Sequence, residues 1–178
     1  MLLLDILNAL PPSFLRGTIW SGGPVPTRQV HASFISPWLA STLGPLLGND
    51  AATVGSTAIV FVDSCVARPL SYEERVHWLG ELALAPHATR VACELESRAR
   101  DDTAFFERAA GVPLLVIMGK EDKHVDVHKC KEVLDAGLGG KGRDYEWAWV
   151  EEAGHAVFWD QPAVHDELVV KFVRRLTS

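Results

Sequence analysis

An aspartate and a histidine stand out because each follows a segment typical of a buried strand. Asp122 lies in MGKED, after the apolar run at 112–118, and His155 lies in EEAGH, after the aromatic run at 145–150. In parallel α/β sheets, active sites form at the carboxyl ends of the strands. If these strands are neighbours, the Asp122 carboxylate can hold the tautomer of the His155 imidazole. This pair would then be the second half of a nucleophile–histidine–acid triad.

The segments around these two residues predict an α/β arrangement. The run VPLLVIM is continuously apolar, as expected for a parallel strand with helices on both faces. Asp126 can cap a helix that extends to about Ala136, and Pro162 suits the first turn of a last helix. The predicted buried face of that last helix comprises Val164, Leu168, Phe172 and Leu176.

Helical patterns dominate the middle of the chain. Ser71 and Glu74 form a predicted capping box for a helix that extends to Leu82. The run at 51–66 is apolar on most sides and favours a helix, although its TAIVFVDS core is also typical of a strand. Residues 90–110 predict one long helix or two broken ones. Nearer the N-terminus, we expect a helix at 2–10 and a short strand at 15–20, which ends at the SGGP turn.

A purely structural role for Asp122 and His155 is the competing interpretation. Aspartate after a strand is a common turn or cap residue, and a Gly-His pair in a loop requires no catalytic function. Spacing alone leaves both interpretations open.

The C-terminal part of the chain resembles the end of an α/β-hydrolase. The matching stretches are VPLLVIMGKEDKHVD and WVEEAGHAVFWDQP, followed by an amphipathic helix. The motif residues are Gly119, Asp122, Gly154, His155 and Pro162. The resemblance covers about the last 70 residues, and its order agrees with the family order of nucleophile, acid and histidine. It implies hydrolysis of ester or amide bonds through a Ser-His-Asp triad, with Asp122 as acid, His155 as base and no cofactor.

The nucleophile of that family is missing from the sequence. The elbow motif G-x-S-x-G occurs nowhere, and Ser21 in WSGG lacks the glycine two positions upstream, so it is a weak substitute. The segment MLLLDILNALPP resembles the helix that follows the elbow. We therefore expect a truncated, inactive hydrolase chain. The alternatives are a non-catalytic binding or vestigial protein, and a relative of the epoxide hydrolases and dehalogenases, which use an aspartate nucleophile on the same fold.

The resemblance predicts a partial α/β-hydrolase fold, with the C-terminal strands of a parallel sheet and a helical insertion. Residues 1–23 would form the helix after the elbow and the next strand. Residues 24–111 would form a helical lid, and residues 112–178 would complete the core with the acid and the histidine.

Two further groups of residues are candidates for binding. Trp38 and Trp78 in the predicted lid, and Trp159 close to His155, could line a pocket for a small apolar substrate, although tryptophans are more often ordinary core residues. His124, Asp126 and His128 occupy alternate positions. In an extended segment all three side chains would lie on one side, where imidazole and carboxylate groups could bind zinc. However, Asp126 suits a helix cap better, and a helix would turn the two histidines apart. We therefore predict no metal site.

Composition limits the remaining possibilities. The 178 residues carry a formal net charge of −6 and no basic stripe, which argues against nucleic-acid binding. Cys65, Cys93 and Cys130 are far apart and predict neither a disulfide framework nor a zinc site. The apolar start at 1–10 is interrupted by polar residues and is too short to span a membrane. We expect a cytoplasmic protein that does not associate with membranes.

Overall fold

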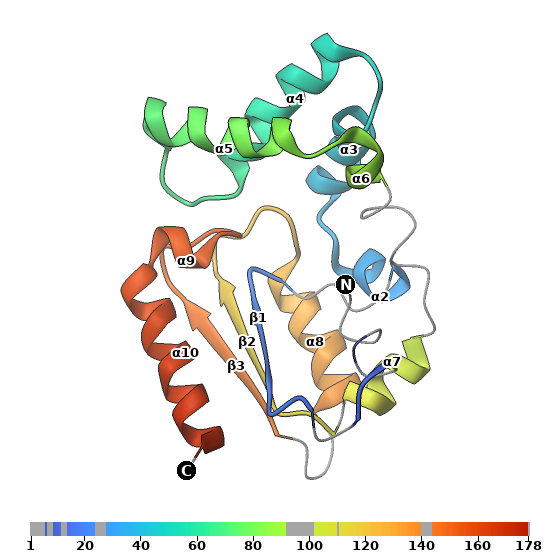
Figure 1. Ribbon diagram of the computed structural model, residues 1–178, viewed down its shortest axis with the longest axis vertical. Helices are drawn as coiled ribbons and strands as arrows, with labels where there is room; N and C mark the ends of the chain where they lie inside the picture. The colour runs from blue at the N-terminus through green and yellow to red at the C-terminus, as the bar shows by residue number, and fades with distance from the viewer. Residues whose placement is uncertain are drawn as a thin grey trace.

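A three-stranded parallel sheet in the order β1-β2-β3 organises the chain, as the computed structural model shows (Figure 1). The strands are β1 (Thr18–Ser21), β2 (Leu114–Gly119) and β3 (Tyr145–Val150). The structure describes residue 6 and residues 9–11, 14–23, 28–91, 102–109, 111–139 and 144–177. The predicted α/β class is confirmed. Most of the predicted helix at 2–10 lies outside the described residues.

The central strand β2 is buried along its whole length. Because successive side chains of a strand point to opposite faces, Leu114, Val116 and Met118 enter one core cluster. Leu115 and Ile117 enter another cluster on the opposite face. This two-sided burial explains why the segment is continuously apolar and does not alternate with polar residues.

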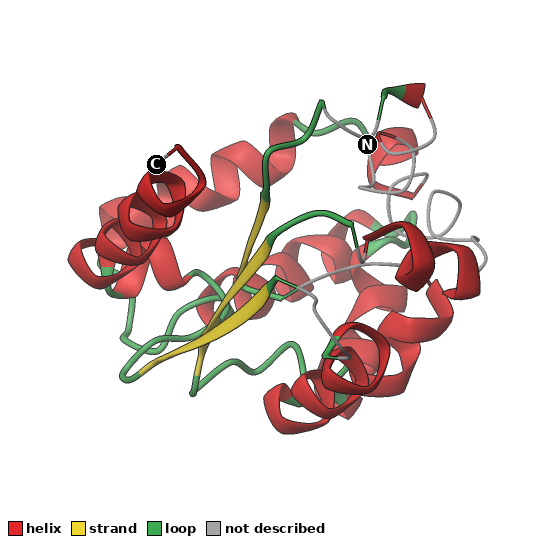
Figure 2. Cartoon of the chain, turned by 90° about the horizontal axis from the view of Figure 1, so that it is seen from below, coloured by secondary structure: helices red, strands yellow, loops and turns green. Residues whose placement is uncertain are grey.

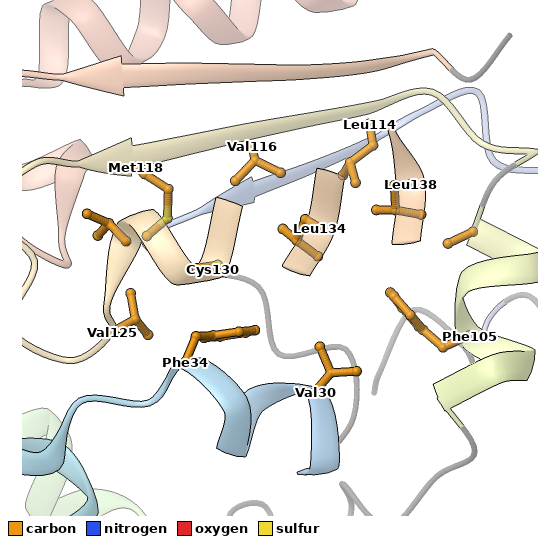
Figure 3. Close-up of a cluster of buried hydrophobic side chains, with 12 residues drawn as sticks. Val30, Phe34, Phe105, Leu114, Val116, Met118, Val125, Cys130, Leu134 and Leu138 are labelled. Atoms are coloured by element: carbon orange, nitrogen blue, oxygen red, sulfur yellow. The ribbon is translucent and has the colours of Figure 1, made fainter. Parts of the chain in front are cut away.

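Helices cover both faces of the sheet. On one face lie α8 (Val127–Leu138), α2 (Arg28–Phe34) and α7 (Asp102–Ala109), whose buried residues form one cluster with β2 (Figure 3). On the other face lie α9 (Val157–Asp160) and α10 (Pro162–Thr177). In Figure 2, the helix that ends at the C-terminus lies on one side of the three strands, and other helices lie on the opposite side.

Four helices lie beyond the carboxyl ends of the strands, at the top of Figure 1. They are α3 (Pro37–Leu46), α4 (Ala51–Ser64), α5 (Tyr72–Leu84) and α6 (His87–Val91). We call them the upper helices. The predicted lid segment 24–111 thus contains two kinds of helix, because α2 and α7 contribute side chains to the core beside the sheet.

Local signals explain several of these boundaries. Ser71 accepts a hydrogen bond from the Glu74 N–H and the Glu74 side chain accepts from the Ser71 N–H, so the predicted capping box is confirmed. Asp126 accepts from the Lys129 N–H and caps α8, also as predicted. The apolar run at 51–66 is helical, with Asp50 as its cap.

One detail of the predicted core is wrong. Val164 is 43% exposed, although its spacing places it with Leu168, Phe172 and Leu176 in α10. Val164 lies in the first turn of α10, directly after α9, whereas Phe172 in the middle of the helix is buried against β2 and β3. Among the described residues, no helix combines the length and apolar character needed to cross a bilayer.

Candidate active site

Asp122 and His155 meet at the carboxyl ends of β2 and β3. The His155 Nδ1 atom lies 2.9 Å from Asp122 Oδ2. The Asp122 side chain is fully buried, whereas the His155 side chain is 35% exposed. The two strands pair in parallel up to Gly119 and Val150, which brings the loops after them together. The sequence-based expectation that these residues lie close together is therefore confirmed.

The other carboxylate oxygen of Asp122 is held by the main chain. Asp122 Oδ1 accepts hydrogen bonds from the N–H groups of His124, at 2.7 Å, and Val125, at 3.2 Å. The buried carboxylate therefore has partners on both oxygens, as a buried charge requires. A hydrogen bond from Nδ1–H to Asp122 leaves the Nε2 atom of His155 able to accept a proton.

Two glycines allow the strand ends to approach the His155 loop. Gly22 has a φ of +78°, and a Cβ atom there would lie 2.1 Å from the carbonyl oxygen of His155. A Cβ atom on Gly119 would lie 2.2 Å from the carbonyl oxygens of Ala153 and Gly154. Both distances are far shorter than any real contact, so these positions require glycine. Sequence reasoning interpreted the Ser-Gly-Gly segment as a turn and Ser21 as a weak substitute nucleophile, and did not relate the two glycines to the His155 loop.

The loop that carries Asp122 is also tied to the segment between α2 and α3. Residues Ile35 and Val125 form an isolated antiparallel bridge. The Ser36 N–H donates to the carbonyl oxygen of His124 at 2.9 Å. These contacts fix the loop on the side that faces the upper helices.

The three residues considered as zinc ligands do not come together. His124 is buried at 2% exposure, Asp126 caps α8, and His128 lies exposed on α8 with its ring 5.5 Å from that of Trp149. Burial lowers the pKa of His124 to about 4, helped by nearby His155 and opposed by Asp122. Within the described part of the chain, no three potential metal ligands form a group that could hold an ion.

No described side chain occupies the position of a nucleophile bonded to His155. The Ser21 hydroxyl is buried without a hydrogen-bond partner in the structure. The Ser64 hydroxyl lies 2.8 Å from Nε2 of His124, not of His155. Burial, reinforced by the charge of Asp122, raises the pKa of the Cys65 thiol to about 12. That thiol is therefore protonated at neutral pH and a poor nucleophile.

The three tryptophans singled out from the sequence lie near the site in two groups. The ring of Trp38 stacks on His124 at 5.6 Å and an interplanar angle of 11°. Trp78 and Trp159 pack edge to face, with ring centroids 5.3 Å apart, around a cluster that includes Ala156 next to His155. Their role as pocket residues stays a prediction.

An apolar cavity of about 230 Å³ lies among the upper helices. Its lining comprises Leu43, Leu46, Leu47, Phe61, Leu82, Ala85, Thr89 and Arg90. Phe61 also stacks on His124, with ring centroids 5.0 Å apart. The cavity therefore borders the residues that surround His155, and Phe61 was not singled out by sequence reasoning.

The fold of the described chain is similar to that of solved esterases. An esterase from a Rhodococcus species is 18% identical, with a TM-score of 0.77 over 97% of this chain and 61% of that one. An esterase from Exiguobacterium antarcticum is 17% identical, with a TM-score of 0.70 over 96% of this chain and 62% of that one. The chain has part of the α/β-hydrolase fold.

The α/β-hydrolase likeness rests on structure, because no family sequence profile and no curated protein matches the chain. A carboxylesterase from Bacillus subtilis also has a similar fold, with 13% identity and a TM-score of 0.67 over 94% of this chain and 54% of that one. The chain spans about three fifths of the length of the first two esterases. At this identity, the likeness establishes the fold alone.

Proposed function

We propose that Asp122 and His155 are the acid and the base of a nucleophile–histidine–acid triad in a hydrolase of ester or amide bonds. The observation that carries this proposal is the 2.9 Å hydrogen bond between His155 Nδ1 and the fully buried carboxylate of Asp122. The fold it shares with solved esterases supports the same chemistry. We assign the nucleophile to a serine that the 178 residues do not contain, because G-x-S-x-G is absent from them.

In the proposed reaction, His155 Nε2 takes the proton of the nucleophile as that group attacks the carbonyl carbon of the substrate. Asp122 stabilises the imidazolium that forms. His155 then gives the proton to the leaving group, and a water molecule releases the acyl group by the same route. All of these steps use side chains and water, so the proposed reaction requires no cofactor.

We propose that the substrate is a small molecule with an apolar part and that the upper helices act as the lid of its pocket. The supporting observation is the apolar cavity of about 230 Å³, whose lining includes Phe61, the ring that stacks on His124. A cavity of about 150 Å³ lined by similar side chains can hold benzene. The cavity among the upper helices therefore suits an acyl or aryl group somewhat larger than benzene.

A first experiment tests the assignment of the nucleophile. The purified 178-residue chain is assayed with short p-nitrophenyl esters beside its His155→Ala variant. We expect both to show the same background rate, because neither contains the assigned nucleophile. Turnover by the chain that disappears in His155→Ala would show that the nucleophile lies within these residues after all.

A second experiment tests the hydrolase assignment itself. The coding DNA upstream of Met1 is sequenced, and we expect an in-frame G-x-S-x-G. The longer chain should hydrolyse the esters, with kcat reduced by about 10⁶ in His155→Ala and about 10⁴ in Asp122→Asn. The control His77→Ala changes an exposed histidine of α5 and should leave kcat unchanged. An upstream frame without the elbow, or an inactive longer chain, would favour a non-catalytic binding protein.

A further inference from the structure

His124 contacts both members of the Asp122–His155 pair. Its main-chain N–H donates to Asp122 Oδ1 at 2.7 Å. Its ring lies against the His155 ring, with centroids 4.3 Å apart and an interplanar angle of 38°. One residue therefore fixes a carboxylate oxygen through its backbone and packs on the imidazole through its side chain.

The upper helices enclose the ring of His124. Trp38 from α3 stacks on it at 5.6 Å, and Phe61 from α4 stacks on it at 5.0 Å. Only 2% of His124 is exposed. In such a packed environment a side chain moves only if its neighbours move, so displacements of α3 or α4 reach His124 directly.

A hydrogen bond from α4 sets the orientation of the His124 ring. Ser64 Oγ lies 2.6 Å from the carbonyl oxygen of Phe61 and 2.8 Å from His124 Nε2. The hydroxyl has a single proton, which it donates to the Phe61 carbonyl, so it accepts a hydrogen bond from Nε2–H of His124. Ser64 is 5% exposed, and an unpaired Nε2–H at this buried place would be costly.

We infer that His124 is a positioning residue that couples helix α4, through the Ser64 hydroxyl, to the orientation of His155. The Ser64 hydrogen bond holds the His124 ring, and the His124 ring keeps His155 against Asp122. This inference rests on the proposed function, in which His155 is the base. The proposed function gives the upper helices a role only in the substrate pocket. We infer here that they also help to orient the base, His155.

The test follows the proton between His155 Nδ1 and Asp122 by NMR in the ¹⁵N-labelled 178-residue chain. Its resonance is assigned by its loss in His155→Ala, and its exchange with water is measured. We expect Ser64→Ala to accelerate this exchange by about twofold to tenfold, the range that corresponds to one buried hydrogen bond. Ser56→Ala is the matched control, because that exposed hydroxyl of α4 donates to the carbonyl oxygen of Thr53.

Two further variants separate positioning from general loosening. Ser64→Thr keeps the hydroxyl and should exchange as slowly as the parent chain. His124→Phe keeps the ring packing but loses the bond to Ser64, so it should accelerate exchange like Ser64→Ala, and the double variant should add nothing further. If His124→Phe does not fold, the comparison of Ser64→Ala with Ser64→Thr decides.

The possible outcomes separate this inference from the proposed function. A resonance that is present in the parent chain but unaffected by Ser64→Ala would overturn the coupling through His124 and leave the acid–base pair intact. Equal acceleration in Ser64→Ala and Ser56→Ala would also overturn it. If the ¹⁵N shifts of the His155 ring, read through its non-exchanging carbon-bound protons, show Nδ1 without a proton, the Asp122–His155 hydrogen bond is absent, and both proposals fail with it.

Discussion

Strand β2 buries all six of its residues, whereas helix α5 has no buried residue among its thirteen. Large apolar side chains are exposed on α4 and α5, namely Ile59, Val60, Tyr72, Val76 and Leu84, and α10 also exposes Val164, Val170 and Val173. The central strand is thus packed on both faces, whereas α5 packs on its neighbours through partly buried side chains such as Trp78, Leu79 and Leu82.

These two regions meet at the candidate site through the apolar cluster around Ala156 and a few hydrogen bonds. The Ala156 N–H donates to the carbonyl oxygen of Cys65 at 2.7 Å. Asp160 Oδ2 accepts from the N–H groups of Ala67 and Gly154, both at 2.8 Å. The His155 loop is therefore anchored on the sheet side by strand pairing, and on the upper side by these hydrogen bonds and by the apolar cluster that contains Ala156 and Trp159. The stability of the site should then respond differently to changes in the two regions.

The largest expected effect comes from the sheet. Met118→Ala removes a fully buried side chain between β2 and α8 and should lower the free energy of unfolding by about 3 kcal/mol. Val76→Ala, at a half-exposed position of α5, should cost less than about 0.5 kcal/mol. Urea denaturation of both variants measures the difference, and equal losses would show that the two regions are packed alike.

The second prediction concerns pH at the boundary between the regions. The pKa of His124 is lowered by burial from 6.5 to about 4. The unfolded chain therefore takes up this proton at a higher pH than the folded chain. The neutral, buried His124 therefore contributes fully to the free energy of unfolding above about pH 6.5, and this contribution is lost as the pH falls towards 4. From pH 7 to pH 5 the loss should be about 2 kcal/mol.

His124→Phe isolates this contribution, because it removes the titrating group and keeps a ring. The free energy of unfolding is measured by urea denaturation at both pH values, and the variant should lose about 2 kcal/mol less than the parent chain. His77→Phe, which changes an exposed histidine of α5, should keep the parent's pH dependence. The same pH dependence in all three proteins would contradict a buried, neutral His124.

The third prediction concerns the close approach of the two regions. A Cβ atom on Gly154 would lie 2.8 Å from the carbonyl carbon of Val66 and 2.9 Å from the nitrogen of Ala67. Gly154→Ala should therefore cost roughly 1 to 2 kcal/mol through overpacking. Gly80→Ala, in α5, meets no atom within 4 Å and should instead stabilise by about 0.5 to 1 kcal/mol. Thermal unfolding would show opposite shifts, and shifts of the same sign would contradict this contact.

The smallest effect compares two helix caps. Asp126→Ala removes the cap of α8, and Ser71→Ala removes the cap of α5. Each should cost about 1 kcal/mol. In hydrogen exchange we expect Asp126→Ala to affect the amides of the sheet, and Ser71→Ala to affect mainly those of the upper helices. If both variants affected all amides equally, the two regions would unfold as one unit.

Much of the fold could be predicted because strong local signals agree with the tertiary structure. The β3 segment, the start of α10 and the caps of α5 and α8 lie where the sequence places them. The apolar run at 51–66 was ambiguous, because a buried helix and a buried strand can have the same composition. The run is helical from Ala51 to Ser64, with Asp50 as its cap, and it packs against α3 and α5.

The sequence predicted that Asp122 and His155 meet if their strands are parallel neighbours, because such strands bring their carboxyl ends to one edge of the sheet, and the structure shows that pairing. The surroundings of this pair were decided by the tertiary structure. The sequence groups His124 with Asp126 and His128, but the start of α8 separates them. The nearest hydrogen-bond partner of the His124 ring is Ser64, 60 residues away, with the Cys65 sulfur at 4.0 Å, and no motif marks either contact. Such a contact depends on how the upper helices pack over the sheet, and only the folded chain determines that.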